Sequence, residues 1–127
     1  MTVGDIEEDV RIILNDTYED AYRFEPKEIF KAMVQGMVNT RNVRPESRYV
    51  NGLLVDLTIQ VPSSFTTEPN GGSLKTFRER TLEMDDRWRE AIVFYVVSRM
   101  YMKDDADTQN ANLVKQYSDL YNTAVQT

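Results

Sequence analysis

Three aspartates, Asp104, Asp105 and Asp107, form the stretch whose residue types and spacing come nearest to a metal site. A calcium loop begins with closely spaced acidic oxygens, but it also needs a glycine at its sharp turn and a bidentate glutamate at its end. The glycine is missing here, and Gln116 stands in the place of the glutamate. We therefore interpret these aspartates as helix-capping groups, worth about 0.5–2 kcal/mol each, and expect no bound metal.

The chain contains no histidine and no cysteine, which removes the usual catalytic bases, nucleophiles and soft metal ligands. A serine such as Ser63 then lacks an imidazole base, and Lys27 or Lys103 would need burial that their polar neighbours do not favour. Adjacent carboxylates such as Glu7 and Glu8 point in different directions on a helix. We predict no enzymatic activity and no cofactor. A hydrolase that uses only carboxylates stays open as a third possible function, after the two binding functions given below.

Arg41, Arg44 and Arg48, together with Tyr49, form the one local concentration of basic and aromatic residues in the sequence. Guanidinium groups can hold phosphates or carboxylates through paired hydrogen bonds. The chain has 15 basic and 21 acidic residues, a net charge of −6, which disfavours a free-standing nucleic-acid binder. An ion pair with a neighbouring subunit or partner protein is therefore favoured over DNA contact, and surface solvation is an equal alternative.

Length and composition indicate one soluble domain. The 127 residues are 41% apolar and 28% charged, values typical of globular proteins. No apolar run approaches the roughly 20 residues that a membrane-spanning helix needs. Because the chain lacks cysteine and its start lacks the basic and apolar regions of a signal peptide, we expect it to be made and used in a cytoplasm.

Helices must position most of these residues. Apolar residues recur at intervals of three and four from Val3, which predicts an amphipathic helix that ends near Asn15. Pro26 suits a first helical turn and opens a second apolar stripe, which predicts a helix that ends near Arg41. Gly36 within this helix indicates either a close helix crossing or a merely tolerated glycine.

Two more helices are predicted near the end of the chain. The first, from about Asp86 to Met102, is apolar almost all round, as is typical of a helix buried in its own domain or between subunits. A short break at residues 103–105 makes it an antiparallel neighbour of the second, which runs almost to the last residue. Tyr117 and Tyr121 on the second helix are of a type enriched at interfaces, although their helical spacing makes the core their default place.

Alternation of apolar and polar residues predicts a strand from Leu53 to Val61. After a turn-rich stretch, the segment from Leu74 to Thr81 is a candidate partner strand, with Phe77 on one face. A two-stranded hairpin is marginally stable alone and needs a helix layer or a neighbouring subunit.

The predicted fold class is therefore mainly α, a bundle of about four helices with an inserted β-hairpin or strand-loop element. A single domain covers residues 1–127. Its helical parts are residues 1–44 and 85–125, and the inserted β/loop element is residues 50–82.

Five segments, taken in order along the chain, are similar to a known set of motifs. They are Arg11-Ile12-Ile13-Leu14-Asn15-Asp16-Thr17, Tyr22-Arg23-Phe24, Val43-Arg44-Pro45-Glu46-Ser47, Arg87-Trp88-Arg89-Glu90-Ala91-Ile92-Val93 and Tyr101-Met102-Lys103-Asp104-Asp105-Ala106-Asp107-Thr108. The set resembles the head-to-tail adaptor (connector, or neck) proteins of tailed bacteriophages. Its most specific parts are the Leu-Asn-Asp-Thr helix end, the Arg-Pro-Glu-Ser segment and the join of the last two helices. The chain departs from a typical short member between Ser63 and Thr81.

The resemblance implies a structural virion protein, because none of the motifs is catalytic. It implies a mostly helical subunit with an inserted β-element, assembled as a homo-oligomeric ring of about twelve copies that binds the portal and closes the neck after DNA packaging. The implied partners are the portal protein, a tail or nozzle protein, and DNA that passes through the lumen without specific binding, with no membrane. The implied location is the virion neck, between capsid and tail, after synthesis in the host cytoplasm.

The candidate surface for subunit or partner contacts combines the basic cluster, the predicted strand edge and two tyrosines. An unpaired strand edge can pair with a segment of the next subunit in a ring. The candidate residues are Arg41, Arg44, Arg48, Tyr49, Leu53, Val55, Leu57, Ile59, Tyr117 and Tyr121. The alternative function is a small helical phage accessory or regulatory module that binds one protein partner.

Overall fold

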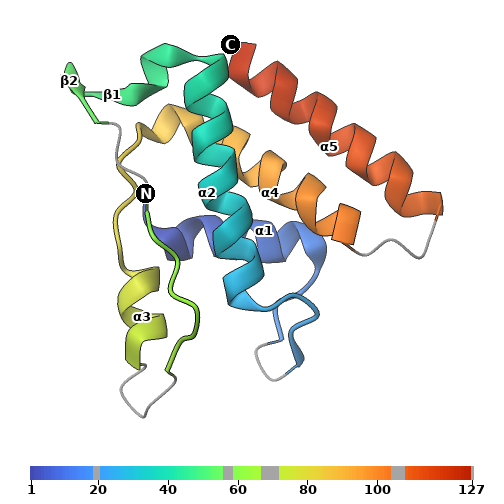
Figure 1. Ribbon diagram of the computed structural model, residues 1–127. Coiled ribbons are helices and arrows are strands. Elements are labelled where there is room, and N and C mark those ends of the chain that lie inside the picture. The colour runs from blue at the N-terminus through green and yellow to red at the C-terminus, as the bar shows by residue number, and fades with distance from the viewer. Residues whose placement is uncertain (19–20, 56–58, 67–71, 104–107, 127) are drawn as a thin grey trace.

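The computed structural model describes residues 1–18, 21–55, 59–66, 72–103 and 108–126. These residues form five α-helices, two short 3-10 helices and one two-stranded antiparallel hairpin (Figure 1). The predicted mainly α fold with an inserted hairpin is therefore confirmed. The aspartates at 104, 105 and 107 lie outside the described residues, and so does the predicted break at residues 103–105 except for Lys103, which is the last residue of a helix.

Helix α1 (Val3–Leu14) begins and ends where its cap residues require. Thr2 Oγ1 accepts a hydrogen bond from the Asp5 amide at 3.2 Å, and Asp5 Oδ2 accepts one from the Thr2 amide at 2.9 Å. This reciprocal pair satisfies two amides that no helical carbonyl can reach. At the other end Asn15 takes a left-handed conformation with φ of 54°, and its amide bonds back to the last turn. The predicted end near Asn15 is confirmed.

The cap makes α1 sensitive to acid. The hydrogen bond from the Thr2 amide is the largest cause that lowers the pKa of Asp5 below its ordinary value. A lowered pKa gives stability that is fully present above the pKa of the unfolded chain and is lost as the pH falls through the folded-state pKa. We expect Asp5→Asn to reduce the loss of stability below about pH 4, measured by urea unfolding at a series of pH values. Parallel pH profiles for the two proteins would contradict this assignment.

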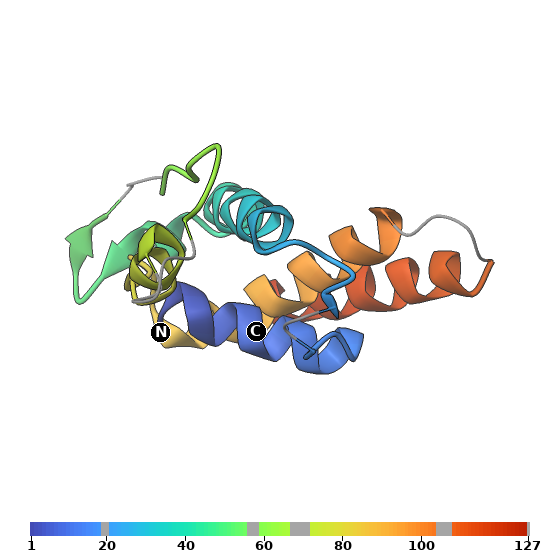
Figure 2. The same ribbon diagram turned by 90° about the horizontal axis from the view of Figure 1, so that it is seen from below.

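Helix α2 (Pro26–Val43) begins with the predicted proline and runs two residues past the predicted end. It crosses α1 and α4 (Arg89–Lys103) steeply instead of lying parallel to them (Figures 1 and 2). At the crossing with α4, a Cβ atom placed on Gly36 would lie 2.9 Å from Cδ1 of Tyr95. The close crossing is therefore the correct interpretation of this glycine, since a larger side chain would overlap the tyrosine ring.

Helix α4 is the centre of the core. A short 3-10 helix, η3 (Asp86–Trp88), leads into it, and α5 (Thr108–Gln126) packs along it, as predicted for the last two helices. Helix α4 also contacts α1 and α2, so it is covered on most sides, which accounts for a sequence that is apolar almost all round. Its fully buried side chains include Ile92, Val96, Val97 and Met100.

The predicted strand from Leu53 to Val61 is confirmed only at its start, Leu53–Leu54; Val55 and residues 59–61 are outside any strand, and residues 56–58 lie outside the described residues. Strand β1 (Tyr49–Val50) pairs with β2 (Leu53–Leu54), with Tyr49 opposite Leu54 and Val50 opposite Leu53. The turn between them is Asn51-Gly52, whose φ values of 53° and 79° have the sign that a tight type I′ hairpin requires. The alternating pattern therefore extends beyond the pairing, and Ile59 lies buried in the core outside any strand.

The predicted partner strand from Leu74 to Thr81 is wrong. Its first part is helix α3 (Gly72–Arg78), which buries Phe77 against the rings of Phe30 and Phe65, with centroids 4.8 and 5.4 Å away. Leu74 and Phe77 are three apart, so a helix places both on one face. Thr81 forms an isolated antiparallel bridge with Thr2, so the start of the chain takes the place of the expected partner.

Candidate interaction surface

The predicted basic cluster is used largely within the subunit. Arg41 is 3% exposed, and its Nη2 donates to the carbonyl of Glu83 at 3.1 Å, so its proposed place at an interface is corrected. Arg44 donates from Nε to the carbonyl of Val125 near the end of α5. Arg48 donates to the carbonyl of Arg41 at 3.5 Å and to Oδ1 of Asn42 at 3.3 Å. These arginines join the end of α2 to three other parts of the chain because each can donate in several directions.

The two candidate tyrosines pack between helices. Tyr121 is 5% exposed, and its hydroxyl lies 2.8 Å from Nδ2 of Asn39 and 2.9 Å from Oγ1 of Thr40. Tyr117 is half-buried between Phe94 and Tyr101. The core is therefore the correct place for Tyr121, and its assignment to an interface is corrected.

The strand candidates divide into exposed, half-buried and buried residues. Leu53 is 70% exposed. Val55 is half-buried, and its amide donates to the carbonyl of Arg48 at 2.6 Å. Ile59 is buried, so it is corrected to a core residue, and Leu57 lies outside the described residues.

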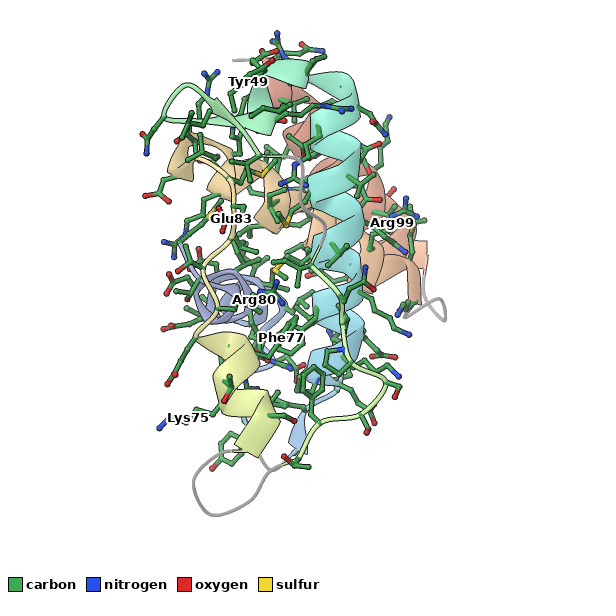
Figure 3. All side chains as sticks on the ribbon, turned by 60° about the vertical axis from the view of Figure 1, so that its left-hand side comes forward. Tyr49, Lys75, Phe77, Arg80, Glu83 and Arg99 are labelled. Carbon is green, nitrogen blue, oxygen red and sulfur yellow. The ribbon has the colours of Figure 1, made fainter. Side chains whose placement is uncertain are left out.

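Three large side chains of the hairpin remain on the surface, and we call them the hairpin patch: Tyr49, Leu53 and Leu54. Their exposed fractions are 50%, 70% and 63%. The hairpin projects at one edge of the molecule, and Tyr49 lies at the opposite end from Lys75 of α3 (Figures 1 and 3). Single exposed apolar residues are ordinary on protein surfaces, but three on one projecting hairpin make it a candidate interaction site.

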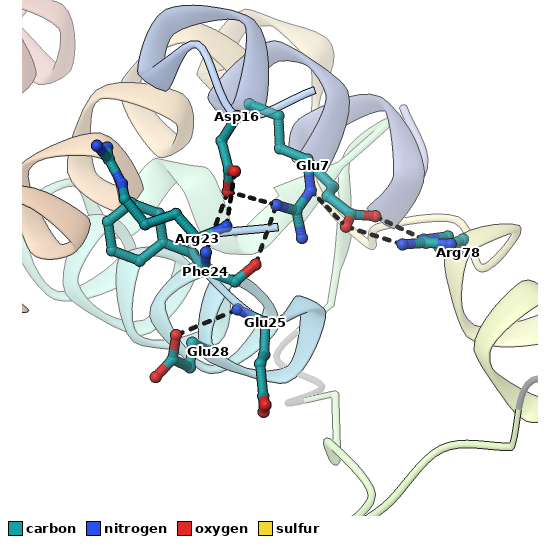
Figure 4. Close-up of polar contacts among 8 residues, drawn as sticks. Glu7, Asp16, Arg23, Phe24, Glu25, Glu28 and Arg78 are labelled. Atoms are coloured by element: carbon teal, nitrogen blue, oxygen red, sulfur yellow. Dashed lines mark hydrogen bonds and ion pairs between the residues drawn. The ribbon is translucent and has the colours of Figure 1, made fainter. Parts of the chain in front are cut away.

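A buried ionic cluster lies where α1, the loop that follows it and α3 meet (Figure 4). Arg11 donates from Nε to Glu7 at 2.9 Å, and from Nη1 to Asp16 at 2.8 Å and to the carbonyl of Phe24 at 3.0 Å. Arg78 on α3 makes two further bonds to Glu7, at 2.6 and 3.0 Å. This cluster is not among the sites predicted from the sequence, although the spacing of Glu7 and Arg11 by four residues is a usable signal.

The cluster is suited to holding the fold together and poorly suited to acid-base chemistry. Both carboxylate oxygens of Glu7 accept from arginines, and Asp16 accepts from Arg11 and from the amides of Arg23 and Phe24 at 2.8 and 3.1 Å. A carboxylate occupied in this way has little capacity to take a proton from a substrate. Among the described residues, no group of three or more acidic side chains is placed to hold a metal ion. No helix in the described part of the chain is long and apolar enough to cross a membrane.

Comparison of the chain with models of protein families, with curated proteins and with solved structures gives no match. The function is therefore inferred from the residues themselves. Two features carry this inference: the hairpin patch, and the segments on which the resemblance to phage adaptors was recognised.

Proposed function

We propose that this protein is a subunit of a head-to-tail adaptor ring in the neck of a tailed bacteriophage. Such a ring binds the portal, extends the DNA channel and presents a docking surface for the tail. The single observation that carries the assembly part of this proposal is the hairpin patch, which leaves Tyr49, Leu53 and Leu54 exposed on a projecting hairpin. The phage part comes from the motif resemblance.

Two of the motif segments, residues 11–17 and 43–47, occupy positions on which the fold depends, and this supports the resemblance. Asn15 ends α1 in a left-handed conformation, and Asp16 anchors the following loop through Arg11. Pro45 opens the 3-10 helix η2 (Pro45–Arg48), and Arg44 joins it to the end of α5. A related subunit with the same motifs would need the same connections, so the motifs describe an architecture.

Burial of the hairpin patch would stabilise an assembly. Apolar surface contributes roughly 25 cal/mol for each Å² removed from water. Rings form through heterologous contacts, in which one face of a subunit binds a different face of the next. The net charge of −6 suits a channel subunit in which acidic side chains face the lumen, because DNA would pass without adhering. A basic lumen in a map of the ring would contradict this part of the proposal.

The oligomeric state tests the proposal directly. We would measure the mass of the purified chain by light scattering, with and without its portal ring. A ring, formed alone or only with the portal, is the expected result. A monomer or dimer that ignores the portal would overturn the adaptor proposal and favour the small accessory module.

We predict that Leu53→Lys with Leu54→Lys prevents assembly and leaves the subunit folded. Both side chains are exposed, so the free energy of unfolding should change by less than about 0.5 kcal/mol. Two charges placed in an apolar contact would carry a desolvation cost that the contact cannot offset. Light scattering and circular dichroism measure the two effects, and Leu120→Lys on α5 is the matched control. A variant ring of normal mass would refute the role of the hairpin patch.

A further inference from the structure

The turn of the hairpin, Asn51-Gly52, combines exposure with a reactive pair of residues. Both residues are exposed, and their φ values are 53° and 79°. A Cβ atom placed on Gly52 would have no atom within 4 Å beyond its chain neighbours, so the space beside this residue is open. The hairpin projects at one edge of the molecule (Figure 1). Water and hydroxide therefore reach the turn.

An asparagine followed by glycine can react with its own backbone. The glycine nitrogen loses its proton to hydroxide and attacks Cγ of the asparagine. The bond from Cγ to the side-chain nitrogen breaks, and ammonia leaves with a proton from water, so that a cyclic succinimide remains. Glycine favours the attack because it has no Cβ atom to hinder the approach. Water then opens the ring at either carbonyl to give aspartate or isoaspartate, and no oxidant or reductant is needed.

The other asparagines in the described part of the chain lack this combination, since only Asn51 among them precedes a glycine. Asn122 is exposed too, but it lies within α5, and the β-branched side chain of Thr123 crowds the nitrogen that would attack. A helix in its hydrogen-bonded interior also opens less readily than an exposed turn. The strands beside Asn51 have only two residues each, so the turn can rearrange for the attack.

We propose that Asn51 is a site of spontaneous deamidation, with water as the co-reactant, and that its isoaspartate product opens the hairpin. The pairing of Val50 with Leu53 closes a turn of two residues. In isoaspartate the main chain passes through Cβ, which adds a backbone atom to the turn and removes the fit that sets this pairing. Aspartate leaves the backbone unchanged, and Asp-Gly favours the same turn. This inference does not depend on the proposed ring.

Ageing of the purified full-length chain tests the modification. The chain is incubated at mildly alkaline pH, folded and in urea, and is then cleaved after glutamate. Cleavage at Glu46 and Glu68 separates Asn51 from Asn70-Gly71, a second pair of the same type that lies outside the described residues. Chromatography with mass spectrometry measures aspartate and isoaspartate at each position. We expect Asn51 in the folded chain to react at no less than about one-tenth of its rate in urea, because an exposed turn opens at little cost.

Two controls make this result decisive. A folded-state rate at Asn51 below that limit, or no greater than the rate at Asn122, would overturn the proposed site. Gly52→Ala should slow the reaction of Asn51 in urea, where the geometry of the turn has no influence and the added Cβ atom hinders the attack. An unchanged rate in that variant would overturn the attack by the Gly52 nitrogen.

The effect on the hairpin is measured on the aged chain after chromatography isolates its isoaspartate form. Nuclear Overhauser effects between Val50 and Leu53 report whether β1 and β2 are still paired. We expect these signals to be lost in the isoaspartate form and kept in Asn51→Asp, which has the charge of the products without the extra backbone atom. Signals kept in both forms, or lost in both, would overturn the proposed effect of isoaspartate. Both measurements use the isolated subunit, so failure of the chain to form a ring would leave this inference standing.

Discussion

Arg11→Met is expected to reduce the free energy of unfolding by about 3–5 kcal/mol, the cost of breaking a buried ion pair by removing one partner. The guanidinium of Arg11 lies between the carboxylates of Glu7 and Asp16, and all three residues are buried. Methionine fills much of the volume but donates no hydrogen bond. The carbonyl of Phe24 and the carboxylate of Asp16 would then lose a buried donor.

An exposed ion pair between α1 and α4 provides the control. Arg89→Met breaks a 2.9 Å contact with Asp9, but both side chains are more than one-third exposed. We expect a loss of only about 0.2–1 kcal/mol there, because water screens the pair. Urea unfolding followed by far-ultraviolet circular dichroism measures both variants. Equal losses would mean that the buried cluster is as well hydrated as the exposed pair, contrary to the structure.

Phe30→Ala is expected to cost about 3–5 kcal/mol, the range for removal of a fully buried aromatic side chain. Phe30 lies on α2 and is fully buried. Its ring contacts Phe65 and Phe77 with centroids 5.6 and 4.8 Å away, so it joins α2 to two segments of the inserted element. Its loss would leave a cavity at the place where α3 is attached.

Local proteolysis near α3 provides a second test of this prediction. Phe77 is the buried residue of α3, so the cavity should raise the rate of proteolysis within residues 72–80 more than elsewhere. Phe65→Ala is the control, because its side chain is only half-buried and its removal should cost less. If proteolysis of Phe30→Ala is no faster within residues 72–80 than elsewhere in the chain, the proposed attachment of α3 through Phe30 is contradicted.

The helices were predictable because their signals are local. Pro26 at a first turn and Asn15 after a last turn act through backbone geometry that the neighbouring residues determine. The apolar stripe from Val3 needs only an apolar surface to pack against, whatever its source. Gly36 left two interpretations open, a close helix crossing or a tolerated glycine, and only the tertiary structure shows that Tyr95 lies against it.

The inserted element was predicted poorly because strand pairing is not local. The alternation from Leu53 to Val61 satisfies a pattern with period two, but pairing requires a partner strand at the right place. Asn51-Gly52 was the missed signal, since this dipeptide favours a tight hairpin that starts before Leu53. The residues from Leu74 carry apolar groups at a spacing of three, which a helix satisfies better than a strand.

The candidate surface was predicted in part for a related reason. Residue type identifies arginine and tyrosine as suited to interfaces, but burial decides whether they are available. Arg41 and Tyr121 lie within the subunit because their polar ends find partners there. Tyr49 and Leu53, in contrast, remain exposed to solvent. Arg78, which completes the ionic cluster, lies 71 residues from Glu7, and no pattern in the sequence connects them.

The contact between Gly36 and Tyr95 also selects the alignment of α2 along α4. If α2 slid by one turn in either direction, Ala32 or Thr40 would replace the glycine at the tyrosine ring. Both residues carry a Cβ atom, and a Cβ atom at this position would lie only 2.9 Å from Cδ1 of Tyr95. A glycine at one position thus excludes the displaced alignments that the apolar stripe alone would permit, and it provides specificity where hydrophobic packing provides only attraction.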